Sequence, residues 1–300
     1  AYYPPVIVGF VAMLVGFFRK APYIYDVQDL WPEALTATGM VKPGKLTKLI
    51  EKSCSLIYRN ARCIVVLSDG YQRALLKKNA PENKIQRIFN WCDESRIGAA
   101  KNVKNDFFNT KKFNIVYAGN MGTAQALEHV IDAAKIIQDQ ENLNINFIFV
   151  GSGVAKEQLI DKADRLSLKN VYFHPQVPAD EIGEILKQAD ALLVHLADQP
   201  VFEITIPSKM QAYLMAGRPI LMAVKGEAAQ VIQDAQAGVV AEPCNSESIA
   251  KAAIEMANIS PTNLEVMGKS GKILYQEKMS MENGVHSVHA IFRSIVAGAK

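Results

Sequence analysis

An α/β fold with parallel sheets, in two domains, is predicted from three features of this 300-residue sequence. The length exceeds that of a usual single domain, so two domains that each bury a core are expected. From Asn114 onward, short runs of β-branched and aromatic residues alternate with segments of helical period, and Gly or Pro ends each run. Such alternation is typical of parallel sheets that helices cover on both faces.

The regular part of the chain predicts a doubly wound domain. Its strands are expected at 114–118, 145–150, 171–173, 191–195, 219–223 and 238–241. Its helices are expected at 125–138, 156–163, 180–188, 208–216, 228–234 and 247–257. Domains of this kind bind ligands at the carboxyl ends of their strands.

The first hundred residues show a thinner version of the same alternation. Strands are predicted at 23–27, 63–68 and 85–89, and helices at 46–59 and 71–78. This pattern resembles the later half of a second doubly wound domain, and the start at Ala1 without Met favours a fragment. The polar segment 93–112 is the predicted linker, and 281–297 reads as a last amphipathic helix. The predicted divisions are 1–109, 110–280 and 281–300.

An apolar run occupies residues 6–18 near the start of the chain. It is shorter than the roughly 20 residues that a membrane-spanning helix needs, so a buried helix is expected. A helix that lies on a membrane surface and a signal-peptide origin are the alternatives. Arg19 and Lys20 follow the run instead of preceding it, which counts against a signal peptide.

Composition excludes some classes of function. Charged residues make up 21%, apolar residues 49%, and the formal net charge is +3, which argues against a nucleic-acid-binding protein. The cysteines form no Cys-x-x-Cys pair, so neither a zinc site nor a redox motif is predicted, and reduced thiols in a cytoplasmic protein are expected. They are Cys54, Cys63, Cys92 and Cys244.

Glycine turns follow the first two strands of the regular domain, at 119–122 and 151–153. Glycines in a strand-to-helix turn let a ligand approach the backbone, and free N–H groups at the helix start favour phosphate. Ordinary turn chemistry is the alternative. Neither turn matches the dinucleotide fingerprint or a P-loop.

Glu203 and Lys209 flank the start of the predicted helix 208–216, which Pro207 and Ser208 begin. Glu203 could accept hydrogen bonds from a diol such as ribose, and Lys209 with the helix N-terminus could hold a diphosphate. The alternative is a helix-dipole acid and a surface lysine.

Histidines give no metal site or catalytic triad. His286 and His289 could share a helix face, but they lack an acidic or cysteine partner and are expected on a solvated surface. His174 and His195 are expected to be hydrogen-bonded residues at strand ends more than bases. No metal site is therefore predicted.

Six segments together resemble the bacterial family 4 glycosyltransferases. The branch is that of surface-polysaccharide enzymes similar to the O-antigen fucosamine transferase and the colanic acid glycosyltransferases. The resemblance runs in order through essentially the whole chain, and it implies that an N-terminal part of the enzyme is absent. The segments are YDVQDLWPEALTATGMV (25–41), CIVVLSDGY (63–71), IFNWCDESRI (88–97), IVYAGNMGTAQALEHVIDAA (115–134), FVGSG (149–153) and IPSKMQAYLMAGRPIL (206–221).

The resemblance implies a GT-B fold, in which two Rossmann-like domains face each other across a cleft. The first would bind the acceptor, the second the sugar nucleotide, and the last helix would cross back to the first domain. The implied reaction is retaining, metal-independent transfer of a hexosyl or N-acetylhexosaminyl group from a nucleotide-diphosphate sugar, expected to be UDP-linked. The implied acceptor is a lipid-linked saccharide of O-antigen or other surface-polysaccharide synthesis. The expected location is the cytoplasm, with peripheral contact at the inner face of the bacterial membrane.

The same resemblance implies the site residues, and it implies no cofactor beyond the donor substrate. The catalytic candidates are Lys209, Asp29, Gln28 and Glu33. The donor-binding candidates are Gly119, Asn120, Gly122, Gln125, Gly151, Glu203, Ser208 and Lys209.

Several positions depart from the family pattern. The second of the family's two glutamates is missing, because that position falls on Gln211 or Ala212. Asn120 and Gln125 replace the Arg and Lys that many members use on the phosphates, and Gln28 stands where many have His.

Two other functions stay open at this point. One is a sugar-nucleotide epimerase of the same fold, which would need acids and histidines in the cleft. The other is a catalytically silent carbohydrate-binding subunit, which the missing glutamate favours. Asp29 and Glu33 could likewise belong to a structural corner, in which Trp31 packs and Glu33 caps a helix.

Overall fold

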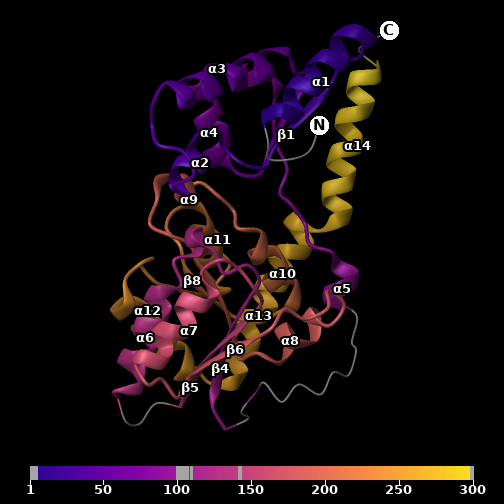
Figure 1. The fold of residues 1–300 in the computed structure, drawn as a ribbon. Helices are drawn as coiled ribbons and strands as arrows, with labels where there is room; N and C mark the ends of the chain where they lie inside the picture. The colour runs from indigo at the N-terminus through magenta and orange to yellow at the C-terminus, as the bar shows by residue number, and fades with distance from the viewer. Residues whose placement is uncertain (1–5, 99–107, 109–110, 141–143, 298–300) are drawn as a thin grey trace. The chain divides into compact units, whose positions relative to one another are not determined.

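The computed structural model describes residues 6–98, 108, 111–140 and 144–297 (Figure 1). Contacts divide the chain into two units. Unit 1 comprises Ala1–Asn90, Gln199–Ile206 and Glu282–Lys300, and unit 2 comprises Trp91–Asp198 and Pro207–Met281.

Unit 1 is built on a parallel sheet of order β1-β2-β3. Its strands are β1 (Ile24–Val27), β2 (Cys63–Val66) and β3 (Ile85–Arg87). Its helices are α1 (Val6–Arg19), α2 (Glu33–Ala37), α3 (Lys45–Asn60), α4 (Asp69–Lys77), η1 (Glu82–Lys84), α9 (Pro200–Glu203) and α14 (Met281–Ala297). The β2 residues are all buried, and Ser68 begins α4 because its side chain accepts the N–H of Tyr71.

Unit 2 contains a six-stranded parallel sheet of order β6-β5-β4-β7-β8-β9. The strands are β4 (Phe113–Ala118), β5 (Ile145–Val150), β6 (Val171–His174), β7 (Ala191–His195), β8 (Ile220–Ala223) and β9 (Gly238–Val240). The strand order reverses between β4 and β7. In a doubly wound sheet, this reversal is where a ligand is expected, beyond the carboxyl ends of the strands.

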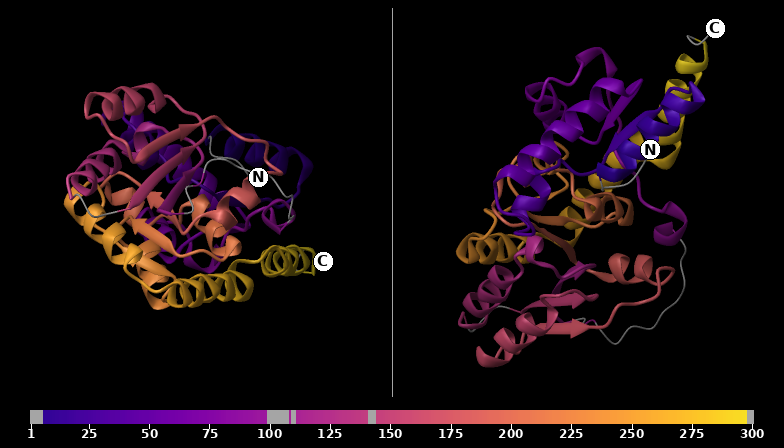
Figure 2. Two further views of the ribbon diagram at one scale, coloured as in Figure 1. Left: turned by 90° about the horizontal axis from the view of Figure 1, so that it is seen from below. Right: turned by 45° about the horizontal axis from the view of Figure 1, so that its top comes forward.

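Helices cover both faces of this sheet (Figures 1 and 2). The face with α6, α7 and α12 lies opposite the face with α8 and α10, and α13 packs on α10. The bounds are α5 (Glu94–Gly98), η2 (Thr123–Gln125), α6 (Glu128–Gln138), α7 (Lys156–Arg165), α8 (Ile182–Gln188), α10 (Ser208–Ala216), α11 (Glu227–Asp234), α12 (Ser246–Ala257), α13 (Pro261–Leu274) and η3 (Tyr275–Met279).

The two-sided cover explains why the strand sequences are almost continuously apolar. Every residue of β5 and of β7 is buried, as expected for central parallel strands. Phe147 and Phe149 of β5 join a core cluster with Ile131 of α6 and Ile249 of α12. The predicted doubly wound α/β fold is therefore confirmed for this part of the chain.

Helix α1 forms over the predicted apolar run, but its predicted burial is wrong. Within α1 only Val6 and Gly9 are buried, while Phe17 and Phe18 are 78% and 77% exposed. The described residues of unit 1 bury only one narrow face of α1. Gly9 lies on that face, where an added Cβ would be 2.7 Å from the Ile57 side chain. The remaining faces of α1 present apolar side chains on the surface.

The predicted linker 93–112 contains structure at its start. Helix α5 packs against α8 and α10 and belongs to unit 2, so the units divide at 90/91 instead of at the predicted 109/110. The contact is close, because a Cβ at Gly183 of α8 would lie 2.5 Å from the carbonyl oxygen of Arg96. Residues 99–107 and 109–110 of the predicted linker lie outside the described residues.

Helix α13 was not predicted, although its start carries a recognisable signal. Ser260 accepts the N–H of Asn263, and Pro261 follows at the first helical position. Gly268 lies against the turn after α10, where an added Cβ would collide with the carbonyl oxygen of Gly217. The glycine thus lets the two backbones meet.

We expect Gly268→Ala to destabilise the chain by about 1–3 kcal/mol, because the methyl group must displace backbone. Urea unfolding measures the change. Gly98→Ala is the matched control, since apart from the adjoining backbone no described residue has an atom within 4 Å of a Cβ built there. Equal stability of the Gly268 and Gly98 variants would contradict the close packing of α13.

Candidate functional site

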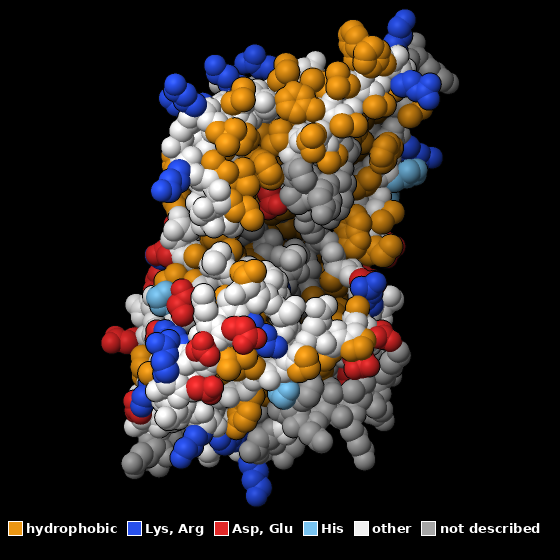
Figure 3. All heavy atoms as spheres, in the orientation of Figure 1, with side chains coloured by type: hydrophobic (Ala, Val, Ile, Leu, Met, Phe, Trp, Pro, Cys, Tyr) orange, Lys and Arg blue, Asp and Glu red, His pale blue; other side chains and the backbone are white. Residues whose placement is uncertain are grey.

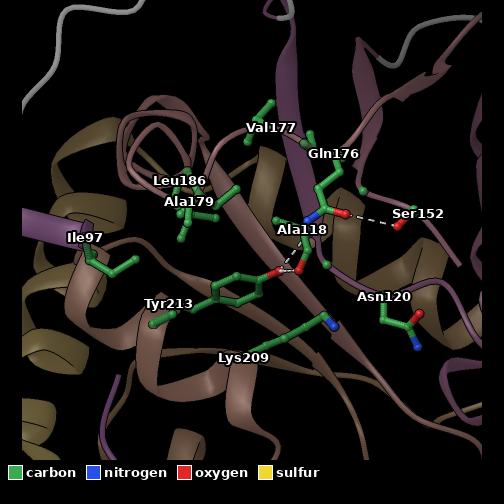
Figure 4. A pocket seen from close by; sticks show the side chains of 15 residues that line it. Ile97, Ala118, Asn120, Ser152, Gln176, Val177, Ala179, Leu186, Lys209 and Tyr213 are labelled. Atoms are coloured by element: carbon green, nitrogen blue, oxygen red, sulfur yellow. Dashed lines mark hydrogen bonds between the residues drawn. The ribbon is translucent and has the colours of Figure 1, made fainter. Parts of the chain in front are cut away.

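A cavity of about 400 Å³ lies in unit 2 at the carboxyl ends of β4 and β5 (Figure 4). Its polar side chains are Asn120, Ser152, Gln176, Lys209 and Tyr213. Its apolar wall consists of Ile97, Val150, Val177, Ala179, Ile182, Leu186 and Ala212. The site therefore combines one cation with amide groups and a broad apolar surface.

Lys209 brings a cation into this cavity from the first turn of α10 (Figure 4). Its Nζ lies 4.7 Å from the ring centroid of Tyr117, and burial lowers the pKa of the lysine to about 8. Among the described residues no carboxylate or hydrogen-bond acceptor pairs with this ammonium group. A desolvated cation without a counter-charge favours an anionic ligand.

Glycine at position 119 makes room for the lysine. Gly119 has a φ of +130°, and a Cβ there would lie 2.8 Å from Lys209 Nζ. Tyr213 fixes α10 against the same strand end, because its hydroxyl accepts the Ala118 N–H at 2.9 Å. Lys156, in contrast, directs its Nζ away to the carbonyl oxygens of Gly151 and His174, each at 2.9 Å.

The two glycine turns interlock through their backbones. Gly151 and Gly153 have φ values of +143° and +148°, and a Cβ on either would collide with the carbonyl oxygen of Gly119 or Met121. The Met121 N–H donates to Ser152 O at 2.7 Å. Only glycine permits this conformation at such close approach.

Four backbone amides of these turns already have hydrogen-bond acceptors. Gly119 N donates to Val150 O, Met121 N to Ser152 O, Gly122 N to Gln125 Oε1 and Gly151 N to His174 O. These four amides are therefore not free to bind a ligand. Lys209 is the cationic side chain in the cavity lining among the described residues.

The predicted donor-binding residues separate into two groups. Gly119, Asn120, Gly151 and Lys209 line the cavity. Gly122, Gln125 and Ser208 do not line it; Gln125 closes its own turn, and Ser208 is exposed at the start of α10. Of the two positions aligned with the missing second glutamate, Ala212 lines the cavity and Gln211 is buried in α10.

Glu203 and Lys209 fall in different units. Glu203 ends α9, its side chain is exposed, and its segment belongs to unit 1, whereas α10 belongs to unit 2. Helix α10 spans Ser208–Ala216 as predicted. A joint action of the two residues on one ligand stays a prediction.

The candidates at the start of the chain lie in unit 1. Gln28 Nε2 donates to Asp26 at 2.7 Å, and Gln28 Oε1 accepts from Asn90 at 2.6 Å, so structural partners occupy the whole amide. Burial raises the pKa of Asp26. Asp29 is exposed.

Glu33 occupies the first turn of α2, where an acid favours the helix dipole. Its carboxylate pairs with the largely buried Lys78 at 2.6 Å. These two contacts account for Glu33 without a substrate and favour the structural-corner interpretation of this residue.

Sequence reasoning missed part of the cavity lining. Val177 and Gln176 follow β6, so the rule that ligands meet strand ends could have indicated them. Ile97 lies in the segment assigned to the linker, and no local signal marks it. Its place depends on α5 packing against α8 and α10.

The described residues contain neither a candidate metal site nor a candidate membrane-spanning helix. No group of three or more His, Cys, Asp or Glu side chains is arranged to hold a metal ion. No helix among them has the length and apolar character required to cross a bilayer.

Comparisons with known proteins identify relatives. The colanic acid biosynthesis glycosyl transferase WcaI of Escherichia coli (strain K12) is 26% identical over 215 residues, which cover 68% of this chain and 51% of that protein. The chain thus spans about half the length of this curated relative.

Solved structures share the fold. Anabaena HepE, in complex with UDP and glucose, has a TM-score of 0.75 at 16% identity and matches 97% of this chain and 76% of its own. WaaG, a glycosyltransferase involved in lipopolysaccharide biosynthesis, has a TM-score of 0.63 at 18% identity, over 85% of this chain and 70% of its own. The fold is GT-B, as the resemblance implied.

The family described as "Glycosyl transferases group 1" matches residues 99–273, which is more than half of the chain and contains the cavity except for Ile97. This chain therefore belongs to the group 1 glycosyl transferases.

Proposed function

We propose that this chain carries the donor site of a retaining glycosyltransferase that uses a UDP-linked sugar. The observation that carries the proposal is Lys209, a desolvated ammonium group that no described carboxylate neutralises, in a cavity at the carboxyl edge of a doubly wound sheet. The solved structure of HepE contains UDP and glucose, which supports the choice of nucleotide.

The cavity offers complementary groups to each part of such a donor. The diphosphate would pair with Lys209, beside Asn120 and the Gly119 backbone. The base would lie on the apolar wall near Val177. Ligand pockets are lined mostly by apolar side chains, which fits an uncharged base. Negative charge on the leaving diphosphate grows as the glycosidic bond breaks, so a positioned cation stabilises the transition state more than the ground state.

The finer parts of the function rest on the family resemblance. These are retention of configuration, metal independence, transfer of a hexosyl or N-acetylhexosaminyl group, and a lipid-linked saccharide acceptor of surface-polysaccharide synthesis. A cytoplasmic location agrees with the four cysteines, which are all unpaired. The cavity lining contains no Asp, Glu or His among its described residues, which disfavours the epimerase. Hydrolysis of UDP-sugars would exclude the silent subunit.

Lys209 gives a proton-linked test of nucleotide binding. Its pKa of about 8 in the free chain leaves it partly neutral at pH 8, and a diphosphate would favour the charged form. UDP binding should therefore take up protons at pH 8 and much less at pH 6, where the lysine is already charged. Calorimetry in buffers of different ionisation enthalpy measures this uptake.

Lys209→Met should abolish the uptake and lower turnover more than it lowers affinity. Equal proton uptake by the parent and Lys209→Met would mean that the lysine does not meet the diphosphate.

Glu203 is proposed to accept hydrogen bonds from the ribose hydroxyls. Such bonds to a charged group contribute about 1.5–3 kcal/mol, so Glu203→Ala should weaken UDP roughly ten- to a hundredfold. Glu157→Ala is the matched control, because Glu157 is an exposed acid in the first turn of α7. If both variants bind UDP like the parent and change only the melting temperature, Glu203 is a helix-dipole acid.

A surface of unit 1 supports contact with an anionic membrane. Helix α1 packs on α3, and both expose apolar side chains, among them Phe17, Phe18, Leu46 and Leu49. Exposed cations accompany them: Arg19, Lys20, Lys42, Lys45, Lys48, Lys52 and Arg59. Figure 3 shows hydrophobic side chains gathered in this region with Lys and Arg at its margins. Apolar insertion with surrounding basic charge fits an anionic lipid surface.

We expect the chain to sediment with anionic vesicles and much less with neutral ones. Phe17→Ser together with Phe18→Ser should weaken vesicle binding by at least about tenfold, because two large apolar groups are lost. Val154→Ser, at an equally exposed apolar site in unit 2, is the control. Absence of vesicle binding, or dimerisation through this face in light scattering, would contradict the membrane assignment.

A further inference from the structure

His195 occupies the carboxyl end of β7 and is 1% exposed. Both ring nitrogens have partners: Nδ1 lies 2.7 Å from the carbonyl oxygen of Gln125, and Nε2 lies 3.2 Å from the amide nitrogen of Cys244. The ring therefore connects the turn after β4 with the segment after β9.

These partners fix the tautomer of the ring. A backbone amide can only donate, so Nε2 must accept from Cys244 and the proton must reside on Nδ1. Nδ1–H then donates to Gln125. Burial lowers the pKa of His195 to about 4, so the ring keeps this neutral form at neutral pH.

Gln125 is the residue through which His195 can act on the cavity. Its side-chain Oε1 accepts the Gly122 N–H at 2.9 Å and so closes the turn that carries Gly119 and Asn120. The next residue, Ala126, has a φ of +43°, a left-handed conformation that a residue with a Cβ rarely adopts. A strained turn of this kind persists only where its surroundings hold it.

We propose that His195 is a positioning residue, whose Nδ1–H holds the Gln125 carbonyl and thereby places Gly119 and Asn120 for the diphosphate. The naming of the ligand rests on the function proposed above. His195 does not line the cavity and both its nitrogens are occupied, so it does not act as a base. A second bond, from Ala197 N to Ala124 O at 2.9 Å, joins the segment after β7 to the same turn, so that His195 holds the last residue of η2.

Two substitutions separate the two bonds of the ring. An Asn amide can replace the Nδ1–H donor, whereas the longer Gln amide can replace the Nε2 acceptor. His195→Asn should therefore keep UDP affinity within about threefold of the parent. His195→Gln keeps the bond to Cys244 but loses the bond to Gln125, and it should weaken UDP by roughly fivefold or more.

Amide exchange of the turn gives a readout that does not need the nucleotide. Exchange of the Gly122 N–H should accelerate in His195→Gln and stay near the parent rate in His195→Asn. Gln125→Ala removes the acceptor of that N–H, so it should accelerate exchange of the Gly122 N–H as well. In a double variant with His195→Gln, the exchange rate should be no faster than in either single variant, because both changes act on the same turn.

The outcomes separate this inference from the proposed function. If the parent does not bind UDP, the proposed function fails, and the exchange pattern still decides the role of His195. Equal effects of His195→Asn and His195→Gln on the turn would overturn the inference, as would a larger effect of His195→Asn. Unchanged Gly122 exchange in Gln125→Ala would overturn it too.

Discussion

Backbone contact between two strand-to-helix turns is the constraint on which the candidate site depends. Gly119 and Met121 after β4 lie against Gly151 and Gly153 after β5, at distances that a Cβ would not permit. The turns bond to each other and to neighbouring strand ends, so their shape exists before any ligand binds. Four of the amides in these turns already have acceptors, and the one charged side chain among the described residues that line the cavity is Lys209.

Lys209 provides that charge at an energetic cost to the free chain. Its ammonium group is desolvated beside Tyr117. Tyr213 bonds α10 to the end of β4, and Gly119 leaves the space that the lysine occupies. A group kept in an unfavourable environment returns that energy when an opposite charge arrives. In the function proposed above, the same lysine would stabilise a diphosphate more as the negative charge on it increases, and its position would thereby contribute to group transfer.

Much of this architecture could be predicted from the sequence. Runs such as INFIFV and ALLVH indicated the strand bounds of β5 and β7, and Pro-Ser-Lys indicated the start of α10, because apolar runs and helix-starting residues are local features of the sequence. Helix α13 was missed because its contact with α10 is made by Gly268 and Gly271, and glycines do not produce a periodic apolar pattern in the sequence. The exposure of α1, the place of Ile97 and the occupied amides of the glycine turns depend on partners distant in sequence, so local patterns could not reveal them.

The central claim is that Lys209 recognises the diphosphate, and the most direct test compares ligands that differ in that group. Calorimetry should measure the affinities of UDP and of uridine for the parent and for Lys209→Met. The account predicts that the parent prefers UDP over uridine, and that Lys209→Met reduces this preference roughly ten- to a hundredfold while uridine binds both equally. A preference for UDP that is the same in both proteins would contradict it.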